Sequence, residues 1–430
     1  MKQLLKSAVV AIITCEAKIL LKRKKPIIIA ITGSVGKTSA KDAIYTVLKG
    51  HEHTRKSQKS YNSDIGVPLS VLGLKNGWSN PVQWLKNIFD GAITAFFDSE
   101  YPNVVVLEVG VDRPGDMKKL TSWLVPDIVV LTRLPEVPVH VEYFSSPEEV
   151  IEEKMQLVHA LKKDGILIYN NDDSKIKQEV QNVLQQSFGF SRYSQSHFTT
   201  SADTVIYKKG KAVGVECLMT HINNKEKFQV YGSLGVQHAY NYAAAIAVGA
   251  QFDISLKDAS TALAQHVPPP GRMRIIQGHK DTLILDDTYN SSPVAVEQAL
   301  QTIKELKNVG RKIAVLGDML ELGRYSVREH EKMGEKAAES ADILLTLGVR
   351  ARNSAETAME NGMSEKVVFQ YDDIETAGKE LLKMIQPNDV ILIKASQGMR
   401  AEKIVERLMA QPEQAPTLLC RQSATWKDKY

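Results

Sequence analysis

Several features that mark specialised classes of protein are scarce in this sequence of 430 residues. Its three cysteines, Cys15, Cys217 and Cys420, are far apart and lack metal-ligand spacing, so they indicate reduced cytosolic thiols rather than a disulfide framework or a zinc site. The net charge of +4 is small for this length, and no basic face interleaved with aromatic residues is evident, so no nucleic acid partner is expected. The sequence also contains no internal repeat and no low-complexity tract.

The amino terminus lacks a long hydrophobic run. Residues 1–25 place apolar side chains at roughly helical spacing among lysines, but the uninterrupted apolar stretch there, Ala8 to Ile13, is too short to span a bilayer. A convincing signal-peptide cleavage site is missing too. We therefore predict an amphipathic helix over residues 1–25, with two roles open: packing on the body or on a partner protein, or lying on an anionic membrane surface.

The clearest motif begins with the apolar run Ile27 to Ile31, the pattern of a strand buried on both faces of a parallel sheet. A glycine-bearing turn then opens into a helix-permissive stretch, which is the layout of a phosphate-binding loop. Lys37 would reach the β- and γ-phosphates of ATP, and the Thr38 hydroxyl would contact Mg²⁺. An ordinary strand-turn-helix corner is the weaker alternative, and ATP chemistry favours a cytoplasmic location. The predicted ATP-binding residues of the loop are Gly33, Ser34, Val35, Gly36, Lys37, Thr38 and Ser39.

The rest of the chain alternates between buried-strand and helical patterns, which indicates an α/β fold with mostly parallel sheets. A chain of this length is expected to form two or three domains. The Pro-Pro-Pro-Gly cluster at 268–271 marks a hinge. We predict a central P-loop ATPase domain over residues 26–271 and a C-terminal Rossmann-like α/β domain over 272–430. The predicted strands are 104–109, 127–131, 165–169, 282–285, 312–316, 343–347 and 390–393, and the predicted helices include 147–162 and 239–250.

Three polar residues follow the loop in an order that suggests chemistry. Glu108 ends a buried strand, and carboxyl ends of strands line the ligand crevice of open α/β sheets, where a carboxylate could hold Mg²⁺. His140 lies in a later loop, and Lys154 lies in a helix among several glutamates. Taken singly, each has an ordinary structural explanation: an exposed strand-end carboxylate, a loop histidine and a lysine paired along a helix.

At this point the sequence resembles the Mur ligases, the ATP-dependent amino acid and peptide ligases of cell-wall precursor synthesis. The matching segments run in family order from about residue 26 to residue 404 and include ITGSVGKTS, YNSDIGVPLSVL, LEVGVDRPGDM, NYAAAIAVG, DDTYNSSP, VLGDMLELG and KASQGMR. The resemblance implies that ATP phosphorylates a peptide carboxylate and that an amine such as D-alanyl-D-alanine attacks the acyl phosphate to form an amide. Most of the catalysis would then be charge neutralisation and positioning.

The same resemblance assigns roles to individual residues. It implies catalytic roles for Lys37, Glu108, His140 and Lys154, with Mg²⁺ held by Thr38, Glu108 and His140 and by Lys154 if that lysine is carbamylated. Neighbouring glutamates would oppose carbamylation of Lys154 by raising its pKa. Further implied positions are Asn241 at the adenine, Arg272 at the phosphates, Asp287 and Asn290 at the ribose, and Asp318, Glu321, Ser396 and Arg400 at the incoming amine.

The sequence departs from the family pattern in places that concern the substrate. The family carries an amino-terminal domain that recognises the UDP part of the precursor, whereas the phosphate loop here begins about 30 residues into the chain, so we expect that domain to be lacking. Arg133 also replaces the family's usual asparagine. Three hypotheses follow: a Mur-type ligase of small-molecule or peptide substrates, a related ligase with a non-UDP acceptor, and a catalytically weak ATP-binding scaffold of cell-wall synthesis.

Overall fold

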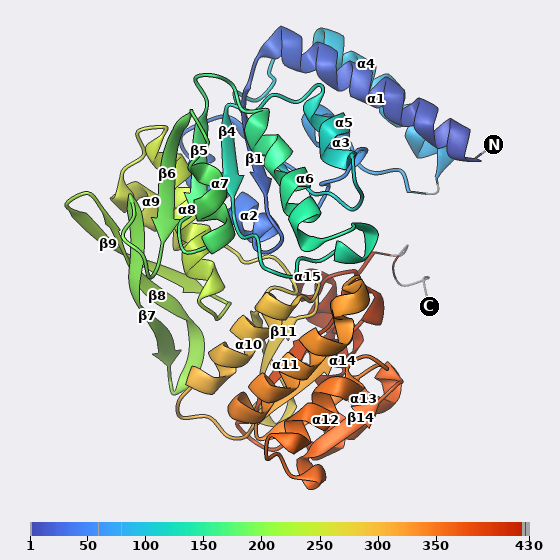
Figure 1. The fold of residues 1–430 in the computed structure, drawn as a ribbon, viewed down its shortest axis with the longest axis vertical. Helices are drawn as coiled ribbons and strands as arrows, with labels where there is room; N and C mark the ends of the chain where they lie inside the picture. Colours follow the sequence, from blue (N-terminus) through green and yellow to red (C-terminus); the bar gives the residue numbers. More distant parts are fainter. Residues whose placement is uncertain (1, 59, 79, 424–425, 427–430) are drawn as a thin grey trace.

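The computed structural model describes residues 2–58, 60–78, 80–423 and 426. In these residues the strands form two sheets, one of nine strands in the order β2-β3-β1-β4-β5-β6-β7-β8-β9 and one of six in the order β10-β11-β15-β12-β13-β14. The two sheets lie in two bodies, one above the other in Figure 1. The predicted α/β class with mostly parallel sheets is confirmed.

The first body holds the phosphate-binding loop. Its strands are β1 (Ile27–Thr32), β2 (Thr54–Lys56), β3 (Val104–Glu108), β4 (Ile128–Leu131), β5 (Ile166–Asn170), β6 (Gln186–Ser191), β7 (Phe198–Lys208), β8 (Lys211–His221) and β9 (Asn224–Tyr231). Its helices are α1 (Lys2–Lys24), α2 (Lys37–Leu48), α3 (Gly66–Leu72), α4 (Pro81–Phe97), α5 (Asp116–Thr121), α6 (Pro147–His159), α7 (Ser174–Val180), α8 (Gln237–Ala250) and α9 (Leu256–Leu263).

The second body follows residue 271. Its strands are β10 (Arg274–Gln277), β11 (Leu283–Asp287), β12 (Lys312–Gly317), β13 (Ile343–Leu347), β14 (Val368–Tyr371) and β15 (Val390–Lys394). Its helices are α10 (Pro293–Glu305), α11 (Ser326–Ser340), α12 (Arg352–Glu360), α13 (Ile374–Met384), α14 (Glu402–Leu408) and α15 (Ala415–Leu418). All strand pairs in this sheet except β10 with β11 are parallel.

Strand β1 shows why the apolar runs become central strands. It pairs in parallel with β3 on one side and β4 on the other, so both of its edges are hydrogen-bonded. Ile28 and Ala30 pack into one hydrophobic cluster, whereas Ile29 and Ile31 pack into a second cluster on the opposite face. Since successive side chains of a strand point to opposite faces, a strand covered on both sides must be apolar throughout.

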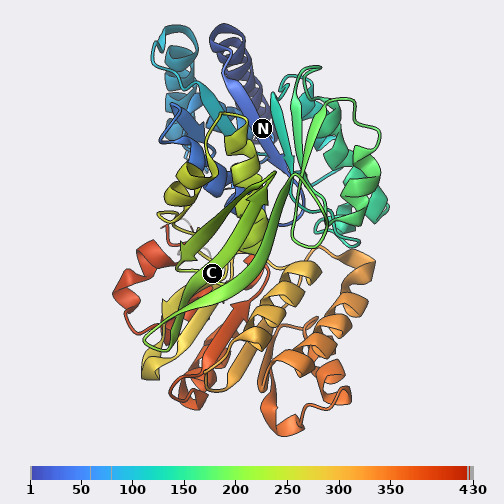
Figure 2. The same cartoon turned by 90° about the vertical axis from the view of Figure 1, so that its left-hand side faces the viewer.

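Helix α1 packs on the body of the protein, which agrees with the first role foreseen for residues 1–25. Its buried residues are Ile13, Glu16, Ala17 and Leu20, and it lies beside α4, an element with no counterpart among the predicted helices (Figures 1 and 2). Contact of α1 with a membrane or a partner stays a prediction. Among the residues described, no helix is both long and apolar enough to cross a membrane.

The two bodies are joined by more than the chain between them. The antiparallel strands β7 and β8 of the first sheet are long enough to reach the second body (Figure 2). There Ala212 packs into the hydrophobic core of the second body. The Tyr207 hydroxyl also accepts a hydrogen bond of 3.2 Å from the backbone N–H of Lys307. A cavity remains between the bodies, lined by Val35 and Gly36 of the phosphate-binding loop and by Gln298 of the second body.

Candidate active site

The loop between β1 and α2 has the backbone shape of a phosphate cradle. Gly33 has φ 136° and Gly36 has φ 89°, backbone angles that residues with a side chain rarely adopt. A Cβ atom on Gly33 would lie 2.2 Å from Oγ1 of Thr132, and one on Gly36 would lie 2.9 Å from Oδ1 of Asn241. Both glycines are therefore required by conformation and by close approach, and the first N–H groups of α2, which have no acceptor within the helix, follow this turn directly.

Lys37, the first residue of α2, folds back over the loop. Its Nζ donates a hydrogen bond of 2.7 Å to the carbonyl oxygen of Gly33. Burial lowers the pKa of Lys37, the negative charge of Glu108 opposes that shift, and Arg272 adds to it. A buried ammonium with only part of its charge balanced by protein carboxylates favours an anionic ligand such as a phosphate.

Glu108 lies at the end of β3 and is almost fully buried. Its Oε1 accepts a hydrogen bond of 3.2 Å from Nδ2 of Asn62, and its Oε2 is 3.8 Å from Nζ of Lys41. Within the described residues, Oε2 has no hydrogen-bond partner. The hydroxyl of Thr38 is 3.3 Å from that of Ser60.

These groups fit Mg²⁺ bound together with a nucleotide. Within the described ranges, no group of three or more His, Cys, Asp or Glu side chains is placed to hold a metal ion by itself. Mg²⁺ commonly takes one or two carboxylates and fills its other positions with phosphate oxygens and water. Oε2 of Glu108, which has no hydrogen-bond partner in the described part of the chain, and the hydroxyl of Thr38 are ligands of that kind.

His140 lies where the two bodies meet. Its Nδ1 is 2.7 Å from Oε2 of Glu321, which comes from the second body, and its Nε2 is 3.6 Å from Oδ1 of Asp112. His140 has φ 71°, in the left-handed region that non-glycine residues seldom occupy. The interaction with His140 holds the pKa of Glu321 below its usual range.

Lys154 is buried in α6, and its surroundings differ from those suggested by its sequence neighbours. Burial lowers its pKa to about 7, and the nearby charge of Lys37 acts in the same direction. Asp112 and Glu153 oppose the shift without cancelling it. Glu153 does raise the pKa of Lys154, as expected of a neighbouring glutamate, but desolvation and Lys37 outweigh it, so the net shift is downward. A neutral amine is the form that adds to carbon dioxide, so this environment favours carbamylation.

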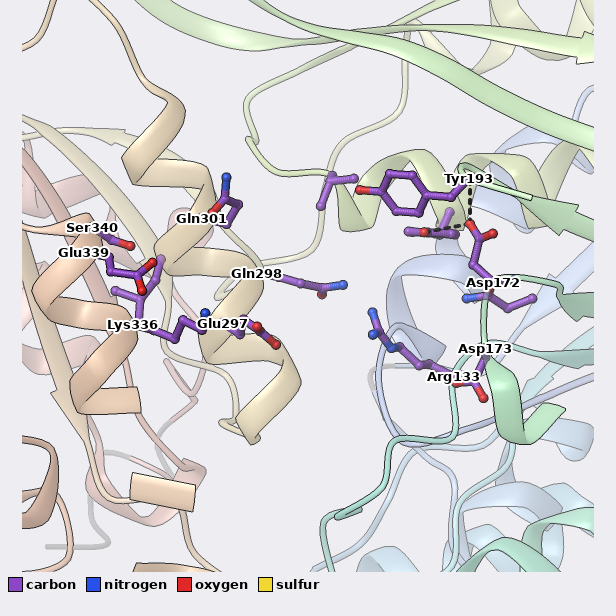
Figure 3. Close-up of a pocket in the computed structure, with 14 residues that line it drawn as sticks. Arg133, Asp172, Asp173, Tyr193, Glu297, Gln298, Gln301, Lys336, Glu339 and Ser340 are labelled. Carbon is purple, nitrogen blue, oxygen red and sulfur yellow. Dashed lines mark hydrogen bonds between the residues drawn. The ribbon is translucent and has the colours of Figure 1, made fainter. Parts of the chain in front are cut away.

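Asn241 projects from α8 toward the phosphate loop and lines a small cavity of about 30 Å³ with Arg133 and Gln298. A larger cavity of about 340 Å³ shares Arg133 and Gln298 with it and lies between the two bodies (Figure 3). Figure 3 shows Asp172, Asp173 and Tyr193 on one side and Glu297, Gln301, Lys336 and Glu339 on the other. The larger cavity has room for a nucleobase with its sugar.

Residues at and after the hinge contact the surroundings of the phosphate-binding loop. Gly271 has φ 70°, and a Cβ there would lie 2.8 Å from the backbone nitrogen of Tyr289. The Arg272 guanidinium lies over the Tyr289 ring, 4.3 Å from its centroid. The Tyr289 hydroxyl donates a hydrogen bond of 2.7 Å to Oγ of Ser60, which adjoins Thr38. Tyr289, in the second body, therefore reaches Thr38 of the phosphate-binding loop through Ser60.

The two residues expected at the ribose have other partners in this structure. Oδ2 of Asp287 accepts a hydrogen bond of 2.6 Å from Nζ of Lys394, and Oδ1 accepts one of 3.1 Å from the backbone N–H of Met273. The same Lys394 donates to the carbonyl oxygen of Asn290 at 3.0 Å. Asp287 thus anchors the hinge, and contact of Asp287 or Asn290 with a ribose stays a prediction.

The residues expected to hold the incoming amine lie at three places in the second body. Glu321 faces His140. Ser396 lies beside Asp318, whose carbonyl oxygen accepts a hydrogen bond of 3.1 Å from the Ser396 N–H. Oδ1 of Asp318 accepts a bond of 2.8 Å from the N–H of Ala351. Nε of Arg400 donates to Glu402 at 2.6 Å, and its guanidinium stacks on Trp426. Arg400 therefore already has a carboxylate partner within the chain.

Sequence reasoning did not single out several residues that support this site. Asp112 adjoins His140 and acts on the pKa of both Lys37 and Lys154, and Asn62 orients Glu108. Both lie in segments that carry the family resemblance, LEVGVDRPGDM and YNSDIGVPLSVL, so their position in a motif was the available signal. Tyr289 contacts Ser60 across the two bodies, and Lys394 contacts Asp287 and Asn290 within the second body; no pattern within one segment indicates such contacts.

Fold and site together define a P-loop nucleotide-binding α/β protein whose cleft is covered by a second α/β unit. Comparison with family models narrows that class. Residues 31–249 match the Mur ligase middle domain, and residues 271–397 match the Mur ligase glutamate ligase domain. The chain belongs to the Mur ligase family.

Its relatives include enzymes of one branch of that family. The UDP-N-acetylmuramoyl-tripeptide–D-alanyl-D-alanine ligase of Bacillus subtilis is 29% identical over 390 residues, which cover 90% of this chain and 76% of that protein. The ligase of the same name from Rickettsia prowazekii is 27% identical over 384 residues, covering 88% of this chain and 77% of that protein.

Solved structures show the same fold. The MurF ligase from Thermotoga maritima in complex with ADP superposes with a TM-score of 0.76 at 24% identity, covering 94% of this chain and 84% of that one. A folylpolyglutamate synthase from Mycobacterium tuberculosis reaches a TM-score of 0.63 at 15% identity, covering 93% and 95%. At these identities the likeness concerns the fold.

Proposed function

We propose that this chain is an ATP-dependent, ADP-forming ligase of the Mur type that joins D-alanyl-D-alanine to the peptide carboxylate of UDP-N-acetylmuramoyl-tripeptide in peptidoglycan precursor synthesis. One observation carries the proposal: Lys37, His140 and Lys154, from three separate segments, converge around Asp112 beside the phosphate loop. The names of the relatives supply the substrates. ATP as co-substrate favours the cytoplasm as the place of action.

The reaction has two balanced steps. An oxygen of the substrate carboxylate attacks the γ-phosphorus of ATP, and ADP leaves. The amine nitrogen then attacks the carbonyl carbon of the acyl phosphate, phosphate leaves, and the amine proton passes to solvent. Bound Mg²⁺ would neutralise phosphate charge, with Thr38 and Glu108 as its protein ligands.

The protein's own groups serve the first step by charge and position. Lys37 and the N–H groups at the start of α2 would hold the phosphates, and Arg272 would approach them from the second body. Lys154, once carbamylated, would present an anionic group near His140. Asn241 and the cavities lined by Arg133 would receive the base, and Asp287 with Asn290 would lie near the sugar.

The second step requires that the acyl phosphate meets the amine and not water. The second body covers the phosphate loop through Tyr289 and Glu321, which reach Ser60 and His140. Closure about Gly271 would exclude water from the intermediate. Asp318, Glu321, Ser396 and Arg400 are the candidate contacts for the dipeptide, with Arg400 depending on release from Glu402.

The test is ADP release by the purified chain with Mg²⁺ and ATP, UDP-N-acetylmuramoyl-tripeptide and D-alanyl-D-alanine, omitting each component in turn. Release that needs both substrates, and that fails in Lys37→Ala, would support the proposal. ATP binding without turnover would refute the acceptor named here. Lipid-linked muropeptides should then be tried as acceptors, and failure with these as well would favour the scaffold hypothesis.

A further inference from the structure

Helix α4 leaves most of its large apolar side chains in water. Its fully buried residues are Asn87, Gly91 and Ala95, and only Trp84 and Ile88 among its large apolar residues pack, partly buried, on the hydrophobic core. The residues that it exposes are large and apolar: Val82 at 74%, Leu85 at 70%, Phe89 at 68%, Ile93 at 45% and Phe96 at 52% of their full exposure. Their spacing of three or four residues places them in one stripe along the helix.

The stripe is unusual for this molecule as well. Among the described residues, the exposed phenylalanines are Phe89, Phe96 and Phe97, and all three lie on α4. Trp78, just before the helix, is also half exposed. A contiguous apolar stripe that a protein leaves in water marks a surface that contacts something else.

The small buried residues explain how the stripe is held outward. Helix α1 packs against the side of α4 that carries Gly91, where a Cβ atom would lie 2.2 Å from Oε2 of Glu16. Nη1 of Arg23 donates a hydrogen bond of 2.5 Å to the carbonyl oxygen of Ala95, near the C-terminal end of α4. The two helices therefore form one unit (Figures 1 and 2), at the end of the molecule opposite to the second body.

Basic residues adjoin the apolar stripe at one end. Residues 1–25 contain seven of the 54 lysines and arginines but one of the 50 acidic residues, whereas the rest of the chain has two more acidic than basic residues. The cluster 22–25 is entirely basic, and the contacts of Arg23 with Ala95 and of Lys24 with the carbonyl oxygen of Ser99 place it beside Phe96 and Phe97.

We propose that the α1–α4 unit binds an anionic lipid surface, with α4 lying in the interface and the basic cluster on the lipid phosphates. An aromatic and aliphatic stripe next to lysines is the composition by which helices lie on anionic bilayers. The charge of the cluster complements phosphate headgroups, and this complementarity selects a membrane over an uncharged protein groove. The proposal is independent of which substrate the ligase uses.

The experiment is co-sedimentation of the full chain with vesicles of phosphatidylcholine alone and of phosphatidylcholine mixed with phosphatidylglycerol. We expect binding to the mixed vesicles that weakens with added salt. The double variant Leu85→Asp and Phe89→Asp, which changes exposed side chains only, should reduce binding about tenfold or more. Lys22→Glu with Lys25→Glu should reduce binding to the mixed vesicles by a similar factor.

Two control variants distinguish binding through the α1–α4 unit from nonspecific binding of the protein to vesicles. Leu184→Asp changes a fully exposed leucine, and Lys257→Glu changes an exposed lysine, both elsewhere on the first body, and both should bind as the unmodified chain does. The proposal is overturned if the chain stays in the supernatant with mixed vesicles, or if the controls lose binding equally. It is also overturned if Phe89→Asp abolishes self-association in sedimentation velocity while vesicles bind nothing, since α4 would then join two copies.

Discussion

The low pKa of Lys154 makes a prediction that separates chemistry from stability. With a pKa of about 7, roughly three quarters of the Lys154 amine is neutral at about pH 7.5, against roughly 0.1% for a lysine with the ordinary pKa of 10.5. The neutral amine is therefore enriched by nearly a thousandfold, and it is the form that reacts with carbon dioxide. We expect a carbamate on Lys154, observed by ¹³C NMR after equilibration with ¹³C-labelled bicarbonate.

Replacing the side chain should have opposite effects on turnover and on stability. Lys154→Met should abolish the ¹³C signal and lower kcat by about a hundredfold or more, because an oriented anion near His140 is lost. Because the pKa of Lys154 is lower in the folded state than its ordinary 10.5, its protonation favours the unfolded state, and this loss of stability disappears as the pH rises from about 7 to about 10.5. In buffer free of carbon dioxide at neutral pH, the free energy of unfolding of Lys154→Met should therefore exceed that of the unmodified chain by up to about 5 kcal/mol, which thermal unfolding would show as a higher Tm.

A matched control is available in the same segment. Lys163 is exposed just after α6, and Lys163→Met should change neither the ¹³C spectrum nor turnover. Acetate or another short carboxylate should partly restore the turnover of Lys154→Met, since it can supply the missing anion. An unmodified chain without a carbamate signal, or a Lys154→Met variant with full turnover, would refute the reasoning.

Three further predictions concern the contacts between helices and between bodies. Burial raises the pKa of Glu16 to about 7, above its ordinary 4.5, so the fold loses stability as the pH rises from about 4.5 to about 7; thermal unfolding of Glu16→Gln should lack this slope. Tyr289→Phe removes the hydrogen bond to Ser60 and should raise the KM for ATP several-fold, about 1 kcal/mol, with a smaller change in kcat. Glu321→Gln weakens the contact with His140, and small-angle scattering should show a larger radius of gyration without nucleotide and a normal one with ATP; an unchanged radius would exclude this contact as a determinant of closure.

The parts of the site that were predictable from sequence depend on local geometry. A glycine turn between an apolar strand and a helix fixes where Lys37 and Thr38 lie, because the loop conformation follows from Gly33 and Gly36. In the same way Glu108 follows a run of valines, and the carboxyl ends of parallel strands share one edge of the sheet. These residues could be located without knowing anything about the second body.

The parts that were not predictable depend on burial and on contacts between distant segments. The glutamates near Lys154 are visible in the sequence, but its desolvation is not, and desolvation decides the pKa. The apolar residues of helix α4 have helical spacing, but spacing does not tell which way the stripe faces, and in the structure the large apolar side chains face outward. The pairing of His140 with Glu321 depends on how the two bodies are oriented.

The contacts at the hinge are linked to the phosphate-binding loop through one intermediate residue. Asp287 holds Lys394 and the backbone of Met273, so we expect the strand end and the hinge to move together. Tyr289, two residues on, lies against the Arg272 guanidinium, and its hydroxyl donates to Ser60, which adjoins Thr38 of the loop. A phosphate bound at the loop would therefore act on the hinge through one short chain of contacts, and no separate sensing element is needed. Because packed contacts of this kind switch between discrete arrangements, nucleotide binding and domain closure are expected to occur as a single cooperative step.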